Sequence, residues 1–84
     1  MKVDRIIATI ALDEKRSLDM ELPVFLPVGE LADKILDALQ NLIPAEFEAV
    51  SEIGLSSGGQ ELASDSTLAS VGLWDGSVLG IIRR

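Results

Sequence analysis

The chain has 84 residues, of which 14 are acidic, 7 are basic and 48% are hydrophobic, with no cysteine and no histidine. A chain of this length forms one domain, and its core must come from apolar burial alone because disulfides and thiolate metal sites are unavailable. The formal net charge of −7 argues against binding to nucleic acid or to an anionic membrane surface.

Neither a membrane span nor a signal peptide is expected from the sequence. No apolar run approaches the length of about 18 residues that a spanning helix needs. Residues 1–5 (MKVDR) are not followed by the long apolar core and small-residue cleavage site of a signal peptide. We therefore expect a single domain over residues 1–84 that is cytoplasmic and does not insert into the membrane directly.

The N-terminal part predicts a β-hairpin. Residues 5–12 are short, aliphatic or β-branched, and residues 13–17 form a charged interruption of loop length. Residues 18–22 then alternate strictly between apolar and polar, which is typical of a half-buried strand. The side chains expected to point inward are those of Ile6, Ala8, Ile10, Leu12, Leu18, Met20 and Leu22.

Residues 28–43 predict a helix of about four turns. Pro27 can occupy its first position, where a missing N–H is harmless, and Pro44 ends it. Ile35 and Leu39, in the middle of the apolar stripe, are expected to be buried against Ile10, Met20 and Leu79. The opposite face is expected to be a solvated acidic surface that consists of Glu30, Asp33, Asp37, Gln40 and Asn41.

Shorter elements are expected in the second half of the chain. Phe47 should pack the returning chain onto the helix, and Leu73 should point inward. In chain order we expect a strand at residues 50–55, a turn at 56–59, a short edge strand at 60–63, one helical turn capped by Ser66 or Thr67, and a last strand at 78–82. The last strand is apolar on both faces, which predicts a central place in the sheet.

This order of elements resembles the β-grasp, ubiquitin-like α+β fold. Within that fold, LDMELP at residues 18–23 followed by PVGEL at residues 27–31 resembles the small ubiquitin-like proteins of type VII secretion. These are the YukD and EsaB proteins of Gram-positive bacteria and the cytosolic N-terminal domain of the EccD membrane component. The resemblance implies a non-enzymatic accessory protein of an ESX-like secretion system, whose partner belongs to the secretion machinery.

The sequence offers no catalytic, metal or cofactor site. Histidine, cysteine and tyrosine are absent, so the usual general base, thiol nucleophile and phenolic acid are missing. The acidic residues at 13–14 and at 30, 33 and 37 lack the ligand spacing of a calcium loop and predict solvated charge. The turn at 57–59 lacks the lysine of a phosphate-binding loop. Arg83 and Arg84 are expected mainly to keep the chain end soluble.

A protein-docking surface is the site that the strand alternation favours. If Leu79 and Ile81 point inward, their neighbours in the last strand point outward, as does a residue of the adjacent first strand. An exposed tryptophan is expected beside the Asp-Gly turn. The predicted docking residues are Ile7, Val78, Ile82 and Trp74.

Three alternatives remain beside this interpretation. The protein could associate with itself through an open edge strand, or it could be an interaction module of a larger multidomain protein. A modifier or sulfur carrier is the least favoured, because no diglycine follows residues 83–84.

Overall fold

The computed structural model describes residues 4–84; residues 1–3, part of the segment from which no signal peptide was expected, lie outside the described residues. The elements along the chain are β1 (Arg5–Ala11), β2 (Ser17–Pro23), α1 (Val28–Leu42), α2 (Pro44–Phe47), β3 (Ile53–Ser57), β4 (Gln60–Glu61) and β5 (Val78–Arg83). Five strands form one mixed sheet in the order β2-β1-β5-β3-β4. The last strand is therefore central, and the predicted β-grasp arrangement is confirmed.

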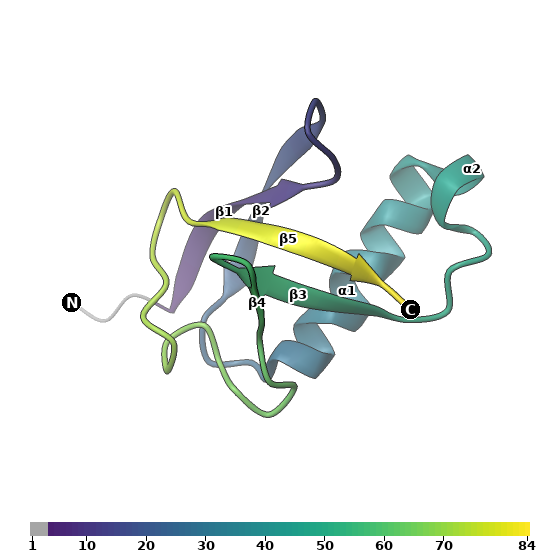
Figure 1. The fold of residues 1–84 in the computed structure, drawn as a ribbon. Coiled ribbons are helices and arrows are strands. Elements are labelled where there is room, and N and C mark those ends of the chain that lie inside the picture. The colour runs from purple at the N-terminus through teal and green to yellow at the C-terminus, as the bar shows by residue number, and fades with distance from the viewer. Residues whose placement is uncertain (1–3) are drawn as a thin grey trace.

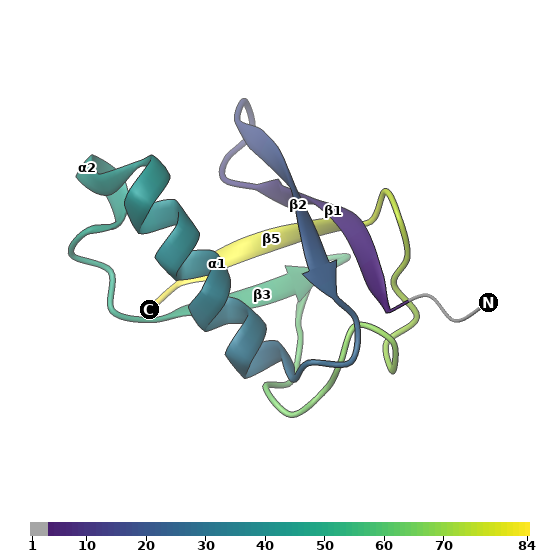
Figure 2. The same cartoon turned by 180° about the vertical axis from the view of Figure 1, so that it is seen from behind.

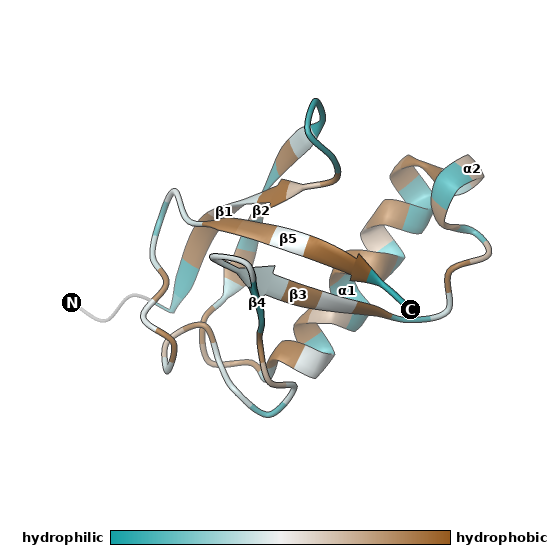
Figure 3. Cartoon of the chain, viewed as in Figure 1, coloured by the Kyte–Doolittle hydropathy of each residue, from teal (hydrophilic) through white to brown (hydrophobic). Residues whose placement is uncertain are grey.

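The sheet has one covered face and one open face. Helix α1 lies behind β5 and β3 in the view of Figure 1 and in front of them in the opposite view of Figure 2. Along α1, hydrophobic and hydrophilic segments alternate (Figure 3), as the apolar stripe predicted. Because one helix covers one face only, the outward side chains of the sheet are available for contacts with another molecule.

The core is aliphatic and lies between α1 and the sheet. Ile35, Leu39, Ile10 and Leu79 are fully buried, as predicted, and Met20 packs against the same cluster from β2. The alternation in β1 and β2 is confirmed, because Ile6, Ala8, Ile10 and Leu22 are buried while Leu12 and Leu18 are partly buried against the core. Neither helix of the described residues is long and apolar enough to cross a bilayer.

Helix α1 begins at Val28, as the apolar stripe predicted. Pro27 precedes the first helical residue instead of occupying that position. The first backbone N–H groups of the helix, which have no acceptor within it, are bound by the loop that follows β4. Val28 donates to the Ser66 carbonyl at 2.7 Å, and Gly29 donates to the Ser64 carbonyl at 2.9 Å.

The segment between α1 and β3 differs from the prediction. A short helix, α2, carries the buried Phe47, and the third strand starts at Ile53, three residues after the expected start at 50. The reason is Gln40, which was assigned to the solvated face. Its side-chain amide is partly buried and donates to the carbonyls of Phe47 at 3.1 Å and Val50 at 3.0 Å. These bonds hold residues 47–50 against α1 and away from the sheet.

The last third of the chain follows the prediction, except that the edge strand β4 is shorter than expected. Strand β4 pairs with β3 at residues 60 and 61 only, because the chain then turns toward the start of α1. Thr67 caps the single turn that follows, since its hydroxyl accepts the Ser70 N–H at 3.1 Å. Leu68 is fully buried and Leu73 packs partly against the core.

Candidate interaction surface

Two of the predicted docking residues lie close together on the open face of the sheet. Strands β1 and β5 pair in parallel, with Thr9 opposite Val78. Ile7 and Val78 point away from the core and are 52% and 54% exposed, although their neighbours Ile6 and Leu79 are buried. In this register Ile7 and Val78 are diagonal neighbours across the pair, close enough for both to contact one partner surface. We call Ile7 and Val78 the outer patch.

The loop before β5 is fastened to the same end of β1. The backbone N–H of Ile7 donates to Oδ1 of Asp75 at 2.7 Å, and the Gly76 N–H donates to the Ile7 carbonyl at 2.9 Å. Gly76 has a φ of +87°, a conformation that favours glycine. These bonds fix the position of the loop that carries Trp74.

Trp74, the third predicted docking residue, is 71% exposed. It lines a hollow of about 330 Å³ at the end of the sheet, together with Ile6, Val24, Ala69, Leu73 and Asp75. Asp75, which also lines this hollow, accepts the Ile7 N–H, so the loop that carries Trp74 is bonded to the strand of the outer patch. A large aromatic side chain in such a position is typical of binding hot spots.

Ile82, the fourth predicted residue, lies apart from the other three. It pairs with Gly54 near the far end of β5 and is only partly buried. Gly80 separates it from Val78 on the same face, and a Cβ at Gly80 would lie 2.5 Å from Oγ of Ser56. A Cβ at Gly54, on the same face, would lie 2.8 Å from the Arg84 guanidinium and 3.0 Å from the Glu61 carboxylate, so side chains of neighbouring segments cover both glycines. Gly54 and Gly80 inside strands were the sequence signal for this close packing.

Polar groups border the outer patch on its β2 side. The Thr9 hydroxyl donates to Oδ1 of Asp19 at 2.8 Å, and an Arg5 guanidinium nitrogen lies 3.3 Å from the Glu21 carboxylate. All four side chains belong to outward positions of paired strands. A partner that binds the outer patch therefore meets an apolar centre with a mixed, partly acidic border.

The acidic hairpin loop is organised around an arginine. Backbone N–H groups of Lys15 and Arg16 and the Arg16 guanidinium bind Asp13, and they hold the pKa of that carboxyl below its ordinary value. Arg16 also binds Glu46 of α2, which lowers the pKa of Glu46. Among residues 4–84, no group of three acidic, histidine or cysteine side chains is placed to hold a metal ion.

The two C-terminal arginines have structural roles that the sequence did not indicate. The Arg83 guanidinium lies 4.6 Å from the centroid of the Phe47 ring, a cation–π distance, and 3.8 Å from Glu46. Arg84 forms an ion pair with Glu61, and its backbone N–H donates to the Glu52 carbonyl at 3.2 Å. Both arginines therefore contact the fold as well as the solvent, which the sequence did not indicate.

A family model for the protein YukD of the WXG100 protein secretion system matches residues 5–81 of the chain. A search of curated protein sequences gives no significant match. The family match covers nearly the whole chain, including both strands of the outer patch.

Several solved structures share the fold. The ubiquitin-like domain of the Mycobacterium tuberculosis type VII secretion protein ECCD1 has a TM-score of 0.78 at 22% identity, covering 95% of this chain and 99% of that chain. The EccD5 ubiquitin-like domain of Mycobacterium xenopi has a TM-score of 0.79 at 14% identity, covering 95% and 94%. A chain of the MycP5-free ESX-5 inner membrane complex has a TM-score of 0.79 at 18% identity, and the match covers 98% of this chain but 21% of that chain.

Proposed function

Because the chain belongs to the YukD family of the WXG100 protein secretion system, we propose that it is a non-enzymatic accessory protein that binds a cytosolic part of a type VII secretion machinery through its outer patch. The observation that carries this proposal is the exposure of Ile7 and Val78 on the open face of the sheet. Apolar side chains grouped in this way commonly mark interfaces.

Binding, as opposed to catalysis, is supported by the chemistry of the surface. The chain has no histidine, cysteine or tyrosine, and the ion pairs of the described residues are on the surface. The partner is proposed from the likeness to a domain within the ESX-5 inner membrane complex. A cytoplasmic location, with recruitment to the membrane by the partner, belongs to the same proposal.

The test compares two substitutions of the same kind at two exposed sites. Ile7→Asp places a charge in the outer patch, and Leu42→Asp places one at the end of α1, where Leu42 is 65% exposed. Binding to purified cytosolic domains of the secretion components is measured by calorimetry. We expect Ile7→Asp to weaken binding at least about tenfold, as loss of a central interface side chain does, while Leu42→Asp binds like the wild type. Ile7→Asp should lower the thermal midpoint somewhat, because Glu21 lies opposite Ile7, so both variants are compared at a temperature at which circular dichroism shows them folded.

Two results would count against the outer patch. One is normal binding by Ile7→Asp combined with Val78→Asp. The other is an equal loss of binding in Leu42→Asp, which would show that a negative charge added anywhere on the domain is sufficient to weaken binding.

A second candidate function follows from the ESX-5 chain, in which a similar domain makes up about a fifth of the polypeptide. In that case the domain is an interaction module of a larger protein and the outer patch contacts neighbouring parts of the same assembly. The length of the reading frame distinguishes this candidate from a separate accessory protein.

A further inference from the structure

The outer edge of β3 is only half covered. Strand β4 pairs with Ser56 and Ser57, and the Leu62 N–H donates to the Leu55 carbonyl at 2.8 Å. The chain then leaves the edge to reach the start of α1. Within the described part of the chain, no strand pairs with this edge at Ile53 and Gly54.

Backbone polar groups of β3 point toward this open edge. Since the Leu55 carbonyl faces β4 and the Glu52 carbonyl faces β5, residues at odd positions in β3 direct their backbone groups to the outer edge. The N–H and C=O of Ile53 therefore lie where a further strand would pair. Such an edge is a ready template for an extended segment of another chain.

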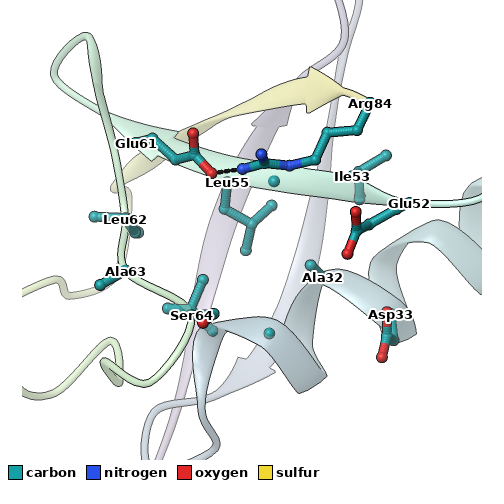
Figure 4. A pocket seen from close by; sticks show the side chains of 13 residues that line it. Ala32, Asp33, Glu52, Ile53, Leu55, Glu61, Leu62, Ala63, Ser64 and Arg84 are labelled. Carbon is teal, nitrogen blue, oxygen red and sulfur yellow. Dashed lines mark ion pairs between the residues drawn. The ribbon is translucent and has the colours of Figure 1, made fainter.

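A hollow of about 540 Å³ lies directly beside the open edge. Figure 4 shows the Leu55 side chain directed into it from β3, with Ala32 of α1 across from it. Its apolar lining also includes Ile53 and Val28, and all four of these side chains are at most 4% exposed. These side chains form the floor of the hollow and are already almost fully covered, so an added strand would lie over them and gain mainly through its backbone pairing.

The rim of the hollow is acidic. Asp33, Glu52 and Glu61 line it, and Arg84 is its one basic side chain among the described residues. Arg84 is already paired with Glu61 (Figure 4), whereas Asp33 and Glu52 have no ion pair within residues 4–84. The rim thus favours a positively charged ligand. A second copy pairing through the same edge would bring two acidic rims together, and each copy carries a net charge of −7.

We propose that the open edge of β3 binds an extended segment of a partner protein that combines short apolar residues with lysine or arginine. The segment adds a strand beside Ile53. Its apolar side chains lie over the floor of the hollow and its basic side chains reach Asp33 and Glu52. This site is separate from the outer patch, because it lies on the β3 edge and not on the open face.

The test uses a defined peptide, acetyl-Lys-Thr-Val-Val-Val-Thr-Lys-amide, added to the ¹⁵N-labelled full chain. We expect amide chemical shifts to change most at Ile53, Gly54 and Leu55, and the Ile53 amide to exchange more slowly with solvent. A twin peptide with glutamate in place of both lysines should not bind. A twin that is N-methylated at alternate amides should not bind either, because it cannot form the ladder of hydrogen bonds.

Charge reversal on the protein supplies the matched comparison. Asp33→Lys combined with Glu52→Lys should weaken peptide binding at least tenfold, whereas Glu14→Lys combined with Glu48→Lys, at exposed positions away from the hollow, should change it by less than twofold. Ile7→Asp should leave peptide binding unchanged, which separates failure of this site from failure of the outer patch.

Three results would overturn the proposal. The lysine and glutamate peptides could shift the same resonances equally. The largest shifts could fall on Ile7 and Val78 instead. Shifts at Ile53 that grow with protein concentration in the absence of peptide would assign the edge to a second copy of the chain.

Discussion

Asp75 and Ile7 are 68 positions apart in sequence, and the carboxylate of one accepts the backbone N–H of the other at 2.7 Å. This bond extends the contact between β1 and the C-terminal part of the chain beyond the strand pairing, which starts at Thr9 and Val78. It also fixes the loop that carries Trp74 beside the outer patch. The geometry of the candidate interface therefore depends on Asp75, which was not among the predicted docking residues.

Asp75→Ala should destabilise the protein by about 1 kcal/mol, the usual net value of one hydrogen bond. Asp75→Asn keeps an oxygen acceptor and should lose less. Urea unfolding, followed by Trp74 fluorescence, measures the change in the free energy of unfolding for both variants. Hydrogen exchange of the Ile7 amide reports independently on the bond to Asp75. Unchanged exchange at Ile7 in Asp75→Ala would show that the bond does not form in solution.

Leu39→Ala should cost about 2–5 kcal/mol, the range for truncation of a core leucine. Leu39 is fully buried in the middle of α1, and so small a domain has little stability to lose. Asp37→Ala, on the exposed face of the same helix, is the control and should change the free energy of unfolding by less than about 0.5 kcal/mol. Equal losses in a denaturant titration would mean that the burial of α1 is described wrongly.

Gln40→Glu should cost about 1–3 kcal/mol at neutral pH, because a carboxylate cannot donate to the carbonyls of Phe47 and Val50. Part of the loss should be recovered near pH 4, where the introduced carboxyl is protonated and can donate once. The same change at Gln60, an exposed residue of β4, should have little effect. A thermal midpoint for Gln40→Glu that matches that of Gln60→Glu would contradict the role of this amide.

Stability should decrease as the pH falls below about 4.5, because Asp13 and Glu46 have lower pKa values in the folded chain than their ordinary 3.8 and 4.5. For a carboxyl whose folded pKa is lowered, the stabilisation is complete above the unfolded pKa and is lost as the pH falls through the folded pKa. Arg16 is bound to both carboxylates, so Arg16→Gln should reduce this acid-dependent loss.

The control for this experiment is Lys15→Gln, which removes one positive charge from the same loop but leaves the Arg16 contacts in place. Thermal midpoints between pH 7 and pH 3 are compared for both variants and the wild type. If Lys15→Gln reduces the acid-dependent loss as much as Arg16→Gln does, the effect comes from loop charge in general.

The elements with regular periodicity could be predicted from the sequence. The alternation of residues 18–22 and the apolar stripe of residues 28–43 follow from burial of one face, and that rule does not depend on distant contacts. The outward direction of Ile7 and Val78 follows from the same alternation. Their exposure in the structure agrees with it, while their role in binding stays a prediction.

Features that depend on one long-range contact could not be predicted. Gln40 is polar and falls on the outer side of the helical stripe, and only the returning chain supplies the carbonyls that it binds. In the sequence, Arg83 and Arg84 are simply two charged residues at the end of the chain. Their contacts with Phe47 and Glu61 exist only in the folded structure. The hollow beside β3 arises because β4 is short, and strand length is among the least certain features of a sequence-based prediction.

The central position of β5 has a consequence for the order of folding. Strands β1 and β2 pair with each other, and β3 pairs with β4, but these two pairs are joined only through β5. During synthesis the chain can form the hairpin and α1 early, yet the sheet remains in two separate halves until residues 78–83 have been made. Folding of this domain should therefore be limited by closure of the β1–β5 pair, a contact of high sequence separation that slows folding, and truncation within β5 should divide the sheet rather than shorten it.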